Sequence, residues 1–358
     1  MSKNTKLIFV PLILMLAFSF CENKPAAKEA NKIELVAGSK ADTLKFTSGI
    51  RAILQDSKGN YWFGSHNEGV GFYNGESFKY FTTNDGLSHN QIRSIQEDES
   101  GRIWFATAKG VSVYDKGSFT RFMTSTNKPV LDWNATKGGL WFYANEEDGI
   151  NRFDGMNMSY LVFPKPKNHS SDRSYGVTGI SIDKDGKLWI STYSALFSYD
   201  GGMVHVFDNK SLKLKDDDNL HIRSVLADSK GRIWIGNNGI GVILKKGNSI
   251  THFSKEQGKL IPADEFAANT QSKQFAKNTG LQAVFVITED SQGNIWFGDR
   301  DSGAWKYDGI TLTNYKINTK SSSQMISCIY EDQDKNLLFG MADGKVLEFN
   351  GSGFERHF

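Results

Sequence analysis

Three arginines recur at one position of a repeated segment, and their type and spacing make them the first candidates for binding chemistry. Arg51, Arg93 and Arg223 each stand second in a short alternating segment that begins with isoleucine. A guanidinium group is a permanent cation that holds a carboxylate or sulfate through two parallel hydrogen bonds. If the copies converge, we expect the three arginines to clamp an anionic group, such as that of a sulfated or uronic sugar. The alternative is that each pairs with acidic residues of a neighbouring copy.

A second set of candidates follows the aromatic part of the same segment. These residues are polar or charged and differ from copy to copy, as the residues of a binding surface do. The ligand-binding candidates of this set are His66, Asn67, Glu68, Tyr193, Asn237, Asn238, Asp299, Arg300 and Asp301. The alternative interpretation is that they belong to ordinary solvated loops.

The elements that would position both sets are seven copies of one phrase, clearest as EDSQGNIWFGD at 289–299. Each copy has a tryptophan anchor except the last, where a leucine takes its place. The anchors are Trp62, Trp104, Trp141, Trp189, Trp234, Trp296 and Leu338, and successive anchors lie 42, 37, 48, 45, 62 and 42 residues apart. A period of roughly 40 to 50 residues is typical of propeller blades or of helical solenoid units.

Composition favours strands over helices in these units. The chain has 35 glycines and 25 phenylalanines, and no long stretch carries an apolar stripe at helical spacing. The copy at 92–122 contains four short segments separated by turns, which is the pattern of a four-stranded antiparallel blade. We therefore predict an all-β fold, a seven-bladed β-propeller over residues 43–358. The ring closes in one of two ways: 353–358 forms the fourth strand of the last blade, or 43–47 pairs with that blade.

In a propeller of this phase, the loops between second and third strands share one face with the junctions between blades. Both candidate sets are then expected around the mouth of one channel. The longest irregularity is an insertion at about 258–280, between blades five and six. Long excursions are more often functional than accidental, so we expect Phe266 and Phe275 to belong to a lid over the channel or to a partner contact.

The repeated phrase itself is better explained by structure than by chemistry. Its Asp and Gly suit a tight hairpin turn, in which Asp caps the turn and Gly takes a positive φ. A calcium loop is the alternative, but no copy has the downstream glutamate that such a loop needs. The tryptophans are expected to pack between blades rather than to stack on a sugar. Cys328 is expected to be a small buried side chain.

The first residues have the pattern of an export signal. Lys3 and Lys6 precede an apolar run that ends at Cys21, so we predict a lipoprotein-type signal peptide at 1–20 and lipidation of Cys21. Ordinary secretion is the alternative. Residues 21–42 are rich in Ala, Lys, Glu and Asn, which predicts a flexible, disordered tether. The expected location is the bacterial cell envelope, periplasmic or surface-exposed, with membrane attachment through this lipid only.

Charge and motif content argue against several functions. The chain has 42 basic and 40 acidic residues, a net charge of +2, and no basic stripe that would favour nucleic acid as a partner. Its seven histidines are scattered, and neither H-E-x-x-H nor G-x-S-x-G occurs. We therefore expect no catalytic residues, no cofactor and no metal. The expected partner is a small molecule, an oligosaccharide or an envelope protein.

The repeats closely resemble the two-component regulator propeller repeat, whose pattern is I-x-x-I-x-E-D-x-x-G-N-I-W-F-G-T followed by G-[LV]-x-x-[YF]-[DN]-G. The blades around Trp62, Trp104 and Trp296 match best, and GLSHNQI at 86–92 is similar to the family's junction between blades. The resemblance implies a periplasmic or surface-exposed sensing or ligand-binding propeller, fused in its best-known members to a transmembrane segment and a histidine kinase. This sequence ends with the propeller, so we expect it to signal through another protein.

Two alternative functions stay open. Seven-bladed propellers of similar turn chemistry include streptogramin-type lyases and lactonases, which hold a metal at the channel mouth. That resemblance implies an enzyme in which His66, Glu68, His89 and His221 lie near this face. The other alternative is a structural platform that assembles envelope proteins and presents an exposed apolar patch.

Overall fold

The structure is a computed structural model. It describes residues 43–122, 139–143, 148–164, 174–215, 218, 220–317 and 323–358. The predicted signal peptide at 1–20, the lipidation site Cys21 and the tether at 21–42 lie outside the described residues.

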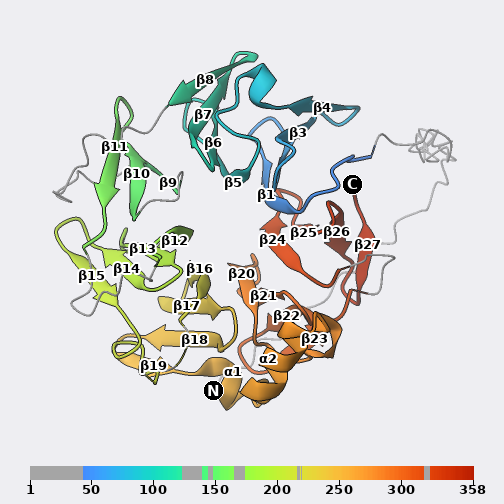
Figure 1. Cartoon of the computed structure of the whole chain (residues 1–358). Coiled ribbons are helices and arrows are strands. Elements are labelled where there is room, and N and C mark those ends of the chain that lie inside the picture. The colour runs from blue at the N-terminus through green and yellow to red at the C-terminus, as the bar shows by residue number, and fades with distance from the viewer. Residues whose placement is uncertain are drawn as a thin grey trace, which may run out of the picture. The chain divides into compact units, whose positions relative to one another are not determined.

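Seven antiparallel sheets surround a central axis, which confirms the predicted seven-bladed β-propeller (Figure 1). Six sheets have four strands in chain order, and the described part of the third blade has three. Blades one and two contain β1 (Ile50–Gln55), β2 (Tyr61–Ser65), β3 (Val70–Tyr73), β4 (Phe78–Phe81), β5 (Ile92–Glu97), β6 (Ile103–Thr107), β7 (Gly110–Asp115) and β8 (Ser118–Phe122). Blades three and four contain β9 (Leu140–Phe142), β10 (Gly149–Phe153), β11 (Met158–Val162), β12 (Val177–Ile182), β13 (Leu188–Thr192), β14 (Leu196–Tyr199) and β15 (Val204–Phe207).

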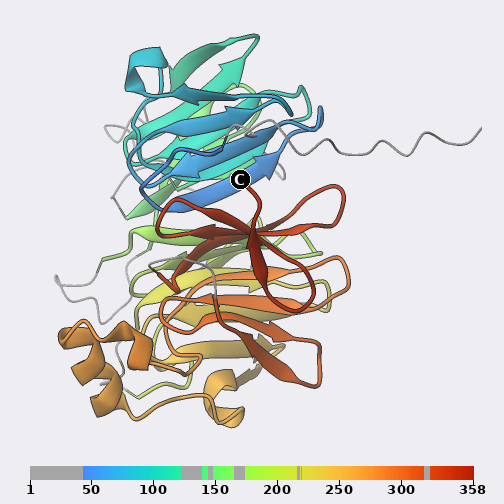
Figure 2. The ribbon, with the colours of Figure 1, turned by 90° about the vertical axis from the view of Figure 1, so that its right-hand side faces the viewer.

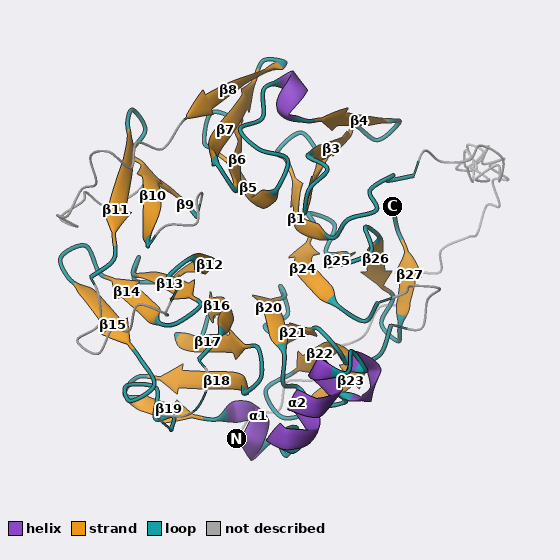
Figure 3. Ribbon diagram, in the orientation of Figure 1, coloured by secondary structure: helices purple, strands orange, loops and turns teal. Residues whose placement is uncertain are grey.

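The last three blades follow the same order. They contain β16 (Ile222–Ala227), β17 (Arg232–Asn237), β18 (Gly241–Lys246), β19 (Ser249–Thr251), β20 (Val284–Glu289), β21 (Ile295–Asp299), β22 (Gly303–Tyr307), β23 (Leu312–Tyr315), β24 (Ile326–Glu331), β25 (Leu337–Met341), β26 (Val346–Phe349) and β27 (Phe354–Arg356). In each four-stranded blade the first strand lies nearest the axis and the fourth at the rim (Figure 3).

The few helices lie in the junctions between blades. They are η1 (Thr83–Asp85), α1 (Phe253–Glu256), α2 (Ala263–Gln271) and η2 (Phe275–Lys277). Pro262 precedes α2, and two acidic residues occupy the first turn of this helix, where they face the positive end of the helix dipole. α2 stands out from one face of the ring, whereas α1 lies at the rim (Figure 1, Figure 2). In the described part of the chain, no helix has the length and apolar content needed to cross a bilayer.

An aspartate in the turn between first and second strands holds both the turn and the tryptophan. Asp56 Oδ1 accepts hydrogen bonds from the backbone N–H groups of Lys58 (3.0 Å) and Asn60 (2.9 Å), and Oδ2 accepts one from Trp62 Nε1 (2.9 Å). The same three bonds recur at Asp98, Asp183, Asp228 and Asp290. The glycine of each turn has a positive φ, for example 84° at Gly59. The interpretation of the motif as a hairpin turn is confirmed.

The tryptophans pack against the following blade. The Trp62 ring centroid lies 5.6 Å from that of Phe105 in blade two, and Trp234 lies 5.6 Å from Phe297 in blade six. Both indoles are at most 2% exposed. Contacts of this kind add to the hydrophobic stabilisation of a buried aromatic ring, so the prediction of packing between blades is confirmed.

In three blades the residue before the turn aspartate is a glutamate, and each of these glutamates bonds a neighbouring blade. Glu97 of blade two accepts hydrogen bonds from Ser57 N (2.7 Å) and Ser57 Oγ (2.6 Å) in the turn of blade one. The equivalent pairs are Ser229 with Glu289 and Ser291 with Glu331. In the acidic pair of the motif, the glutamate therefore bonds the turn of the preceding blade, and the aspartate bonds the backbone of its own turn.

Blade seven lacks the tryptophan, and Tyr61 of blade one supplies the missing donor. The Tyr61 hydroxyl donates to Asp332 Oδ2 at 2.8 Å. Burial, followed by this hydrogen bond, raises the pKa of Tyr61, so the hydroxyl keeps the proton that it donates. At the ring closure, the turn aspartate of blade seven therefore accepts a hydrogen bond from a tyrosine hydroxyl, where the equivalent aspartates of other blades accept one from an indole.

The C-terminal segment completes blade seven. β27 pairs with β26 of the same blade, and Phe358 packs against Phe63 of blade one with ring centroids 4.8 Å apart. Residues 43–47 form no strand, although Leu44 and Phe46 are buried in the core that joins these two blades. Of the two closures considered, the structure has the fourth strand from the C-terminal segment.

Cys328 lies in β24 as a buried free thiol. Its Sγ donates to the backbone oxygen of Ile50 at 3.4 Å, and burial raises the pKa of the thiol to about 12. A thiol held in this form behaves as a small packed side chain, which confirms the expectation for this residue.

Replacing Tyr61 with Phe should weaken the closure of the ring. The change leaves a buried carboxylate oxygen of Asp332 with one donor fewer, so we expect the free energy of unfolding to fall by about 1–3 kcal/mol. Denaturant unfolding measures the loss. Tyr73→Phe in the same blade is the matched control, because its hydroxyl bonds only an exposed carbonyl, that of Gly75. Equal losses in the two variants would show that the bond between Tyr61 and Asp332 does not hold the ring.

Candidate functional site

In the six blades whose first strand the structure describes, a β-bulge in that strand turns one side chain toward the axis. In blade one the register moves from Ile50 opposite Ser65 to Ala52 opposite Gly64, which leaves Arg51 as the extra residue. A bulge re-aims a side chain while the strand continues. The same shift occurs in five other described blades, and the six extra residues are Arg51, Arg93, Thr178, Arg223, Phe285 and Ser327.

The glycine that follows the aromatic pair of the repeat lets the innermost strands approach one another. A Cβ atom at Gly64 would lie 2.5 Å from Ile92 Cγ2, and one at Gly298 would lie 2.8 Å from Ile326 Cγ2. Each of these isoleucines directly precedes a bulged residue. The small residue of one blade therefore fixes the position of the side chain that the next blade presents to the axis.

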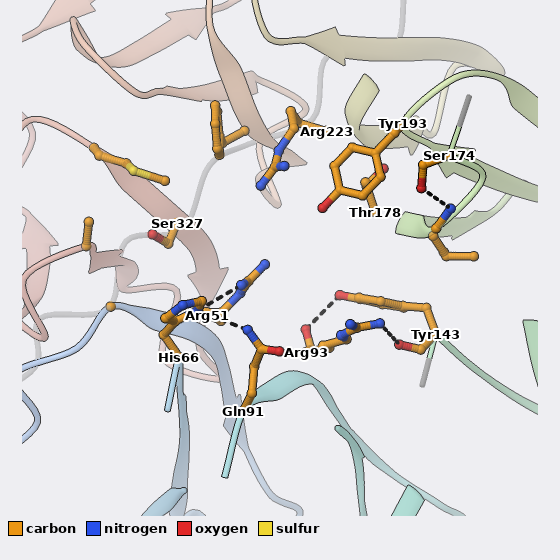
Figure 4. Close-up of a pocket in the computed structure, with 16 residues that line it drawn as sticks. Arg51, His66, Gln91, Arg93, Tyr143, Ser174, Thr178, Tyr193, Arg223 and Ser327 are labelled. Atoms are coloured by element: carbon orange, nitrogen blue, oxygen red, sulfur yellow. Dashed lines mark hydrogen bonds between the residues drawn. The ribbon is translucent and has the colours of Figure 1, made fainter. Parts of the chain in front are cut away.

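All six bulged residues line one central cavity of about 720 Å³, termed the upper cavity. A space of this size holds a small ligand. His66, Gln91, Ser174 and Tyr193 line it from the loops and junctions of one face. Figure 4 shows the side chains of the three arginines pointing into this space. None of the described lining residues is acidic, so the potential of the cavity is positive.

Arg51 is held by a neutral histidine. Its Nη1 donates to His66 Nδ1 at 3.0 Å, and Gln91 Nε2 lies 3.3 Å from the same nitrogen (Figure 4). Because arginine has no acceptor, Nδ1 must carry the lone pair and the imidazole proton must lie on Nε2. Burial, and then the charge of Arg51, lower the pKa of His66 below 6.5. The histidine is therefore neutral at pH 7 and leaves the arginine charge uncompensated.

Arg223 lies between aromatic rings. Its Cζ is 4.2 Å from the ring centroid of Phe285 and 5.4 Å from that of Tyr193. Burial lowers the pKa of Arg223, yet a guanidinium stays charged at all physiological pH values. Across the described residues, no carboxylate forms an ion pair with Arg51 or Arg223. The alternative of pairing with acidic neighbours is thus not what the structure shows for these two arginines.

Arg93 is positioned by Tyr143, a residue that the sequence interpretation missed. Arg93 Nη1 donates to the backbone oxygen of Tyr143 at 3.3 Å, and the Tyr143 hydroxyl donates to the backbone oxygen of Arg93 at 2.7 Å. Tyr143 occupies the repeat position that is glycine, alanine or serine in blades one, two and four to seven. The sequence signal that could have identified Tyr143 is its size, since the other described copies have a small residue at this position.

Of the nine loop candidates, His66 and Tyr193 line the upper cavity and the other seven lie outside it. Glu68 accepts hydrogen bonds from the backbone N–H groups of Thr47 (3.0 Å) and Ser48 (2.7 Å) and from both hydroxyls. Burial alone would raise the pKa of Glu68, but these bonds outweigh it and lower the pKa. Asn67 is exposed, and Asn237 is buried at the end of β17. Glu68 therefore anchors the chain where it enters the propeller.

Asp299 organises the loop that follows β21. Its carboxylate accepts hydrogen bonds from the backbone N–H groups of Gln282, Ala283, Asp301 and Ser302 at 2.8–3.0 Å. Burial raises the pKa of Asp299 to about 6 in spite of these bonds, which favour the charged form. Asp299 is buried and does not line the upper cavity.

Arg300 fastens the insertion between blades five and six. It forms a bidentate pair with the buried Asp301, at 2.6 and 2.7 Å, and its Nη1 donates to Asn238 Oδ1 at 3.4 Å. Its guanidinium also lies 4.7 Å from the Phe275 ring and 5.5 Å from the Phe266 ring. The two phenylalanines therefore pack on Arg300, and no described residue of 258–280 lines the upper cavity. The insertion lies beside blade six and does not cover the channel.

The histidines considered for a metal do not converge. His66 Nδ1 accepts a hydrogen bond from Arg51, and His89 Nδ1 accepts one from the backbone N–H of Gln91 at 2.9 Å. Glu68, the carboxylate considered with them, accepts hydrogen bonds from Ser48 instead. His221 packs edge-on against Tyr193 with centroids 5.1 Å apart. Within the described residues, no group of three or more His, Cys, Asp or Glu side chains could hold a metal ion.

Sequence comparison identifies the repeat. The family model of the two component regulator propeller matches residues 45–67, 86–109, 171–194, 216–239 and 280–301. These segments lie in blades one, two, four, five and six, so the two blades with the most divergent copies are the ones without a match. No curated protein matches the chain in sequence.

Solved structures share the fold at low sequence identity. Virginiamycin B lyase from Staphylococcus aureus has a TM-score of 0.63 at 15% identity, covering 86% of this chain and 96% of that chain. The extracellular domain of a putative one component system from B. thetaiotaomicron has a TM-score of 0.61 at 21% identity, covering 86% of this chain and 39% of that one. YCF48 from Cyanidioschyzon merolae has a TM-score of 0.57 at 14% identity, covering 86% and 98%. The likeness is one of fold.

His66 should titrate below 6.5, and the charge of Arg51 should be part of the cause. We expect Arg51→Ala to move the pKa of His66 upward, because the change removes a neighbouring positive charge. A pH titration of the His66 Cε1–H resonance by NMR measures both values. Lys79→Ala, which removes an exposed charge on β4, should leave the titration unchanged. A His66 pKa at or above 6.5 in the native protein would contradict this assignment.

Removing the Arg300 guanidinium should release the insertion. Arg300→Gln leaves the buried Asp301 carboxylate without its cation, so we expect hydrogen exchange of residues 263–277 to accelerate roughly a hundredfold. Hydrogen exchange with mass spectrometry locates the effect. Lys273→Gln, an exposed change in the same segment, is the matched control. Unchanged protection in Arg300→Gln would mean that the insertion is held by other contacts.

Proposed function

We propose that this chain, which belongs to the two component regulator propeller repeat proteins, is a non-catalytic ligand-binding or sensing propeller of the cell envelope. The ligand is a small organic anion, which the upper cavity binds through Arg51, Arg93 and Arg223. Acidic saccharides, with carboxylate or sulfate groups, are the first class to test. Signalling then passes to a partner protein of the envelope.

The observation that carries this proposal is positive charge that the cavity does not compensate. Arg51 bonds a neutral imidazole, and Arg223 is stacked on aromatic rings. Their neighbours hold both side chains in place, so little conformational entropy remains to be lost on binding. A carboxylate or sulfate supplies acceptors for the remaining N–H groups of both guanidinium groups, and charge-assisted hydrogen bonds of this kind are about twice as strong as neutral ones.

The position of the site in the repeat supports a binding role. Asp, Trp and Gly recur because they hold the frame, whereas the bulged position varies between blades. Three of the six described bulges carry arginine, and the others carry Thr178, Phe285 and Ser327. A fixed frame that presents unlike side chains to one cavity is the usual arrangement of a ligand site.

The envelope location rests on two observations. One is the export-signal pattern that ends at Cys21 in the sequence. The other is the fold, which is shared with the extracellular domain of a putative one component system from B. thetaiotaomicron. Both support a propeller that meets its ligand outside the cytoplasm. Lipid anchoring at Cys21 is part of the proposal, and mass spectrometry of the purified mature protein tests it.

Calorimetric titration with glucuronate, galacturonate and sulfated saccharides at low salt tests the ligand class. We expect Arg51→Ala and Arg223→Ala to weaken binding of an anionic ligand by roughly 10- to 100-fold each, because each loses charge-assisted hydrogen bonds. Neutral saccharides of the same ring should bind far more weakly.

The matched control is Lys79→Ala, which removes the same charge from the outer strand and should change affinity less than about twofold. Unchanged melting temperatures would show that the arginine variants still fold. Tight binding of a neutral ligand, with equal affinity in the arginine variants and the native protein, would contradict the proposal.

A further inference from the structure

A second cavity of about 470 Å³, termed the lower cavity, adjoins the upper one along the axis. The two cavities share part of their lining, including Arg51, Thr178, Arg223, Phe285 and Ser327. The bulged residues other than Arg93 therefore lie at the boundary between the two cavities, and Arg51 and Arg223 line both spaces.

The two cavities differ in chemistry. The lower cavity has more aliphatic lining than the upper one, namely Leu140, Ile180, Ile182, Val225, Val286 and Ile287, beside neutral polar residues such as Ser94, Gln96 and Ser181. Apart from Arg51 and Arg223, its described lining includes no charged residue. Polarity thus decreases along the axis, from polar loops and arginines in the upper cavity to strands with several aliphatic side chains in the lower one.

Part of this aliphatic lining is exposed. Ile182 is 54% exposed at the end of β12, although it lines a cavity near the axis. Ile180 and Val286 are half-buried. Apolar surface of this kind loses contact with water when an apolar group fills the space, which favours binding.

Two hydroxyls beneath the arginines lack partners. Ser94 Oγ and Ser224 Oγ are buried without a hydrogen-bond partner, and both residues line the lower cavity. Ser224 is only 8% exposed. Ser224 Oγ lies 2.5 Å from the place that a Cβ atom at Gly236 would take, so this hydroxyl faces the neighbouring strand of its own blade and not the cavity.

From this polarity gradient we infer that the ligand is an organic anion that carries an apolar substituent. This inference rests on the proposed function, since it takes the anionic head to lie at Arg51 and Arg223. The substituent occupies the lower cavity against Ile180, Ile182 and Val286. A ligand with hydroxyls all around would leave them without partners against these aliphatic side chains, which costs free energy.

A homologous series of carboxylates tests the inference with probes of known structure. Acetate, butanoate, hexanoate, octanoate and decanoate present one head group with a growing apolar tail. We expect affinity, measured by calorimetry, to rise about fourfold per added methylene until the lower cavity is filled, because each buried methylene contributes a constant increment. Phenyl-terminated carboxylates of matched length then show whether the tail is best accepted as an alkyl chain or an aromatic ring.

Ile182→Thr shortens the apolar wall at an exposed site and so leaves folding intact. It should weaken binding of the longest carboxylates several-fold and leave acetate unaffected. Ile310→Thr, at a side chain that is 90% exposed on the turn between β22 and β23, is the matched control and should change neither.

The outcomes separate the two proposals. Affinity that rises with tail length, and that Ile182→Thr reduces only for long tails, supports the inference. Anions that bind with no dependence on tail length overturn the inference but leave the proposed function standing. Failure of every anion to bind, with the protein folded, overturns both.

Discussion

A single buried hydrogen bond, from a tryptophan indole to a turn aspartate, is the constraint on which the rest of the molecule depends. In five described blades one carboxylate caps the hairpin and also accepts the indole N–H, as in the bond between Trp104 and Asp98 at 2.7 Å. Leaving such a carboxylate without donors would cost several kcal/mol. The bond therefore ties the turn, the second strand and the aromatic contact with the next blade into one unit. At the ring closure Tyr61 replaces the indole at Asp332, so the requirement is for the buried donor rather than for tryptophan itself.

This frame explains how unlike residues come to share one site. Where a glycine of one blade contacts the β-branched residue that begins the first strand of the next, as Gly64 contacts Ile92, the bulge that follows is presented to the axis. Selection can then change the bulged side chain without disturbing the frame. Arg51, Arg93 and Arg223 are such changes, and the aliphatic residues further along the innermost strands give the channel a second, apolar compartment. In blade three Tyr143 takes the place of the small residue, and it forms two hydrogen bonds with Arg93.

Much of the fold follows from the sequence because the repeat is periodic and its turn chemistry is local. The same regularity places the three arginines at one register, so their convergence was predictable. The roles of the loop residues were not, because polar side chains that bind a ligand look the same in sequence as those that bind backbone. Glu68 and Asp299 accept backbone hydrogen bonds, and Arg300 holds the insertion. Which way an insertion folds depends on such long-range pairs, and the lower cavity depends on how all the blades meet, which no single copy specifies.

The most direct test follows the arginine side chains themselves. Nitrogen-edited NMR of the arginine Nε–Hε groups, assigned through single Arg→Lys variants, reports which guanidinium groups an added carboxylate contacts. The resonances of Arg51, Arg93 and Arg223 should shift together and saturate at one ligand concentration, while that of Arg121, which bonds the Gly86 carbonyl on the outer part of blade two, stays in place. Shifts spread evenly over all arginines, or confined to those outside the channel, would contradict an anion site at the axis of the propeller.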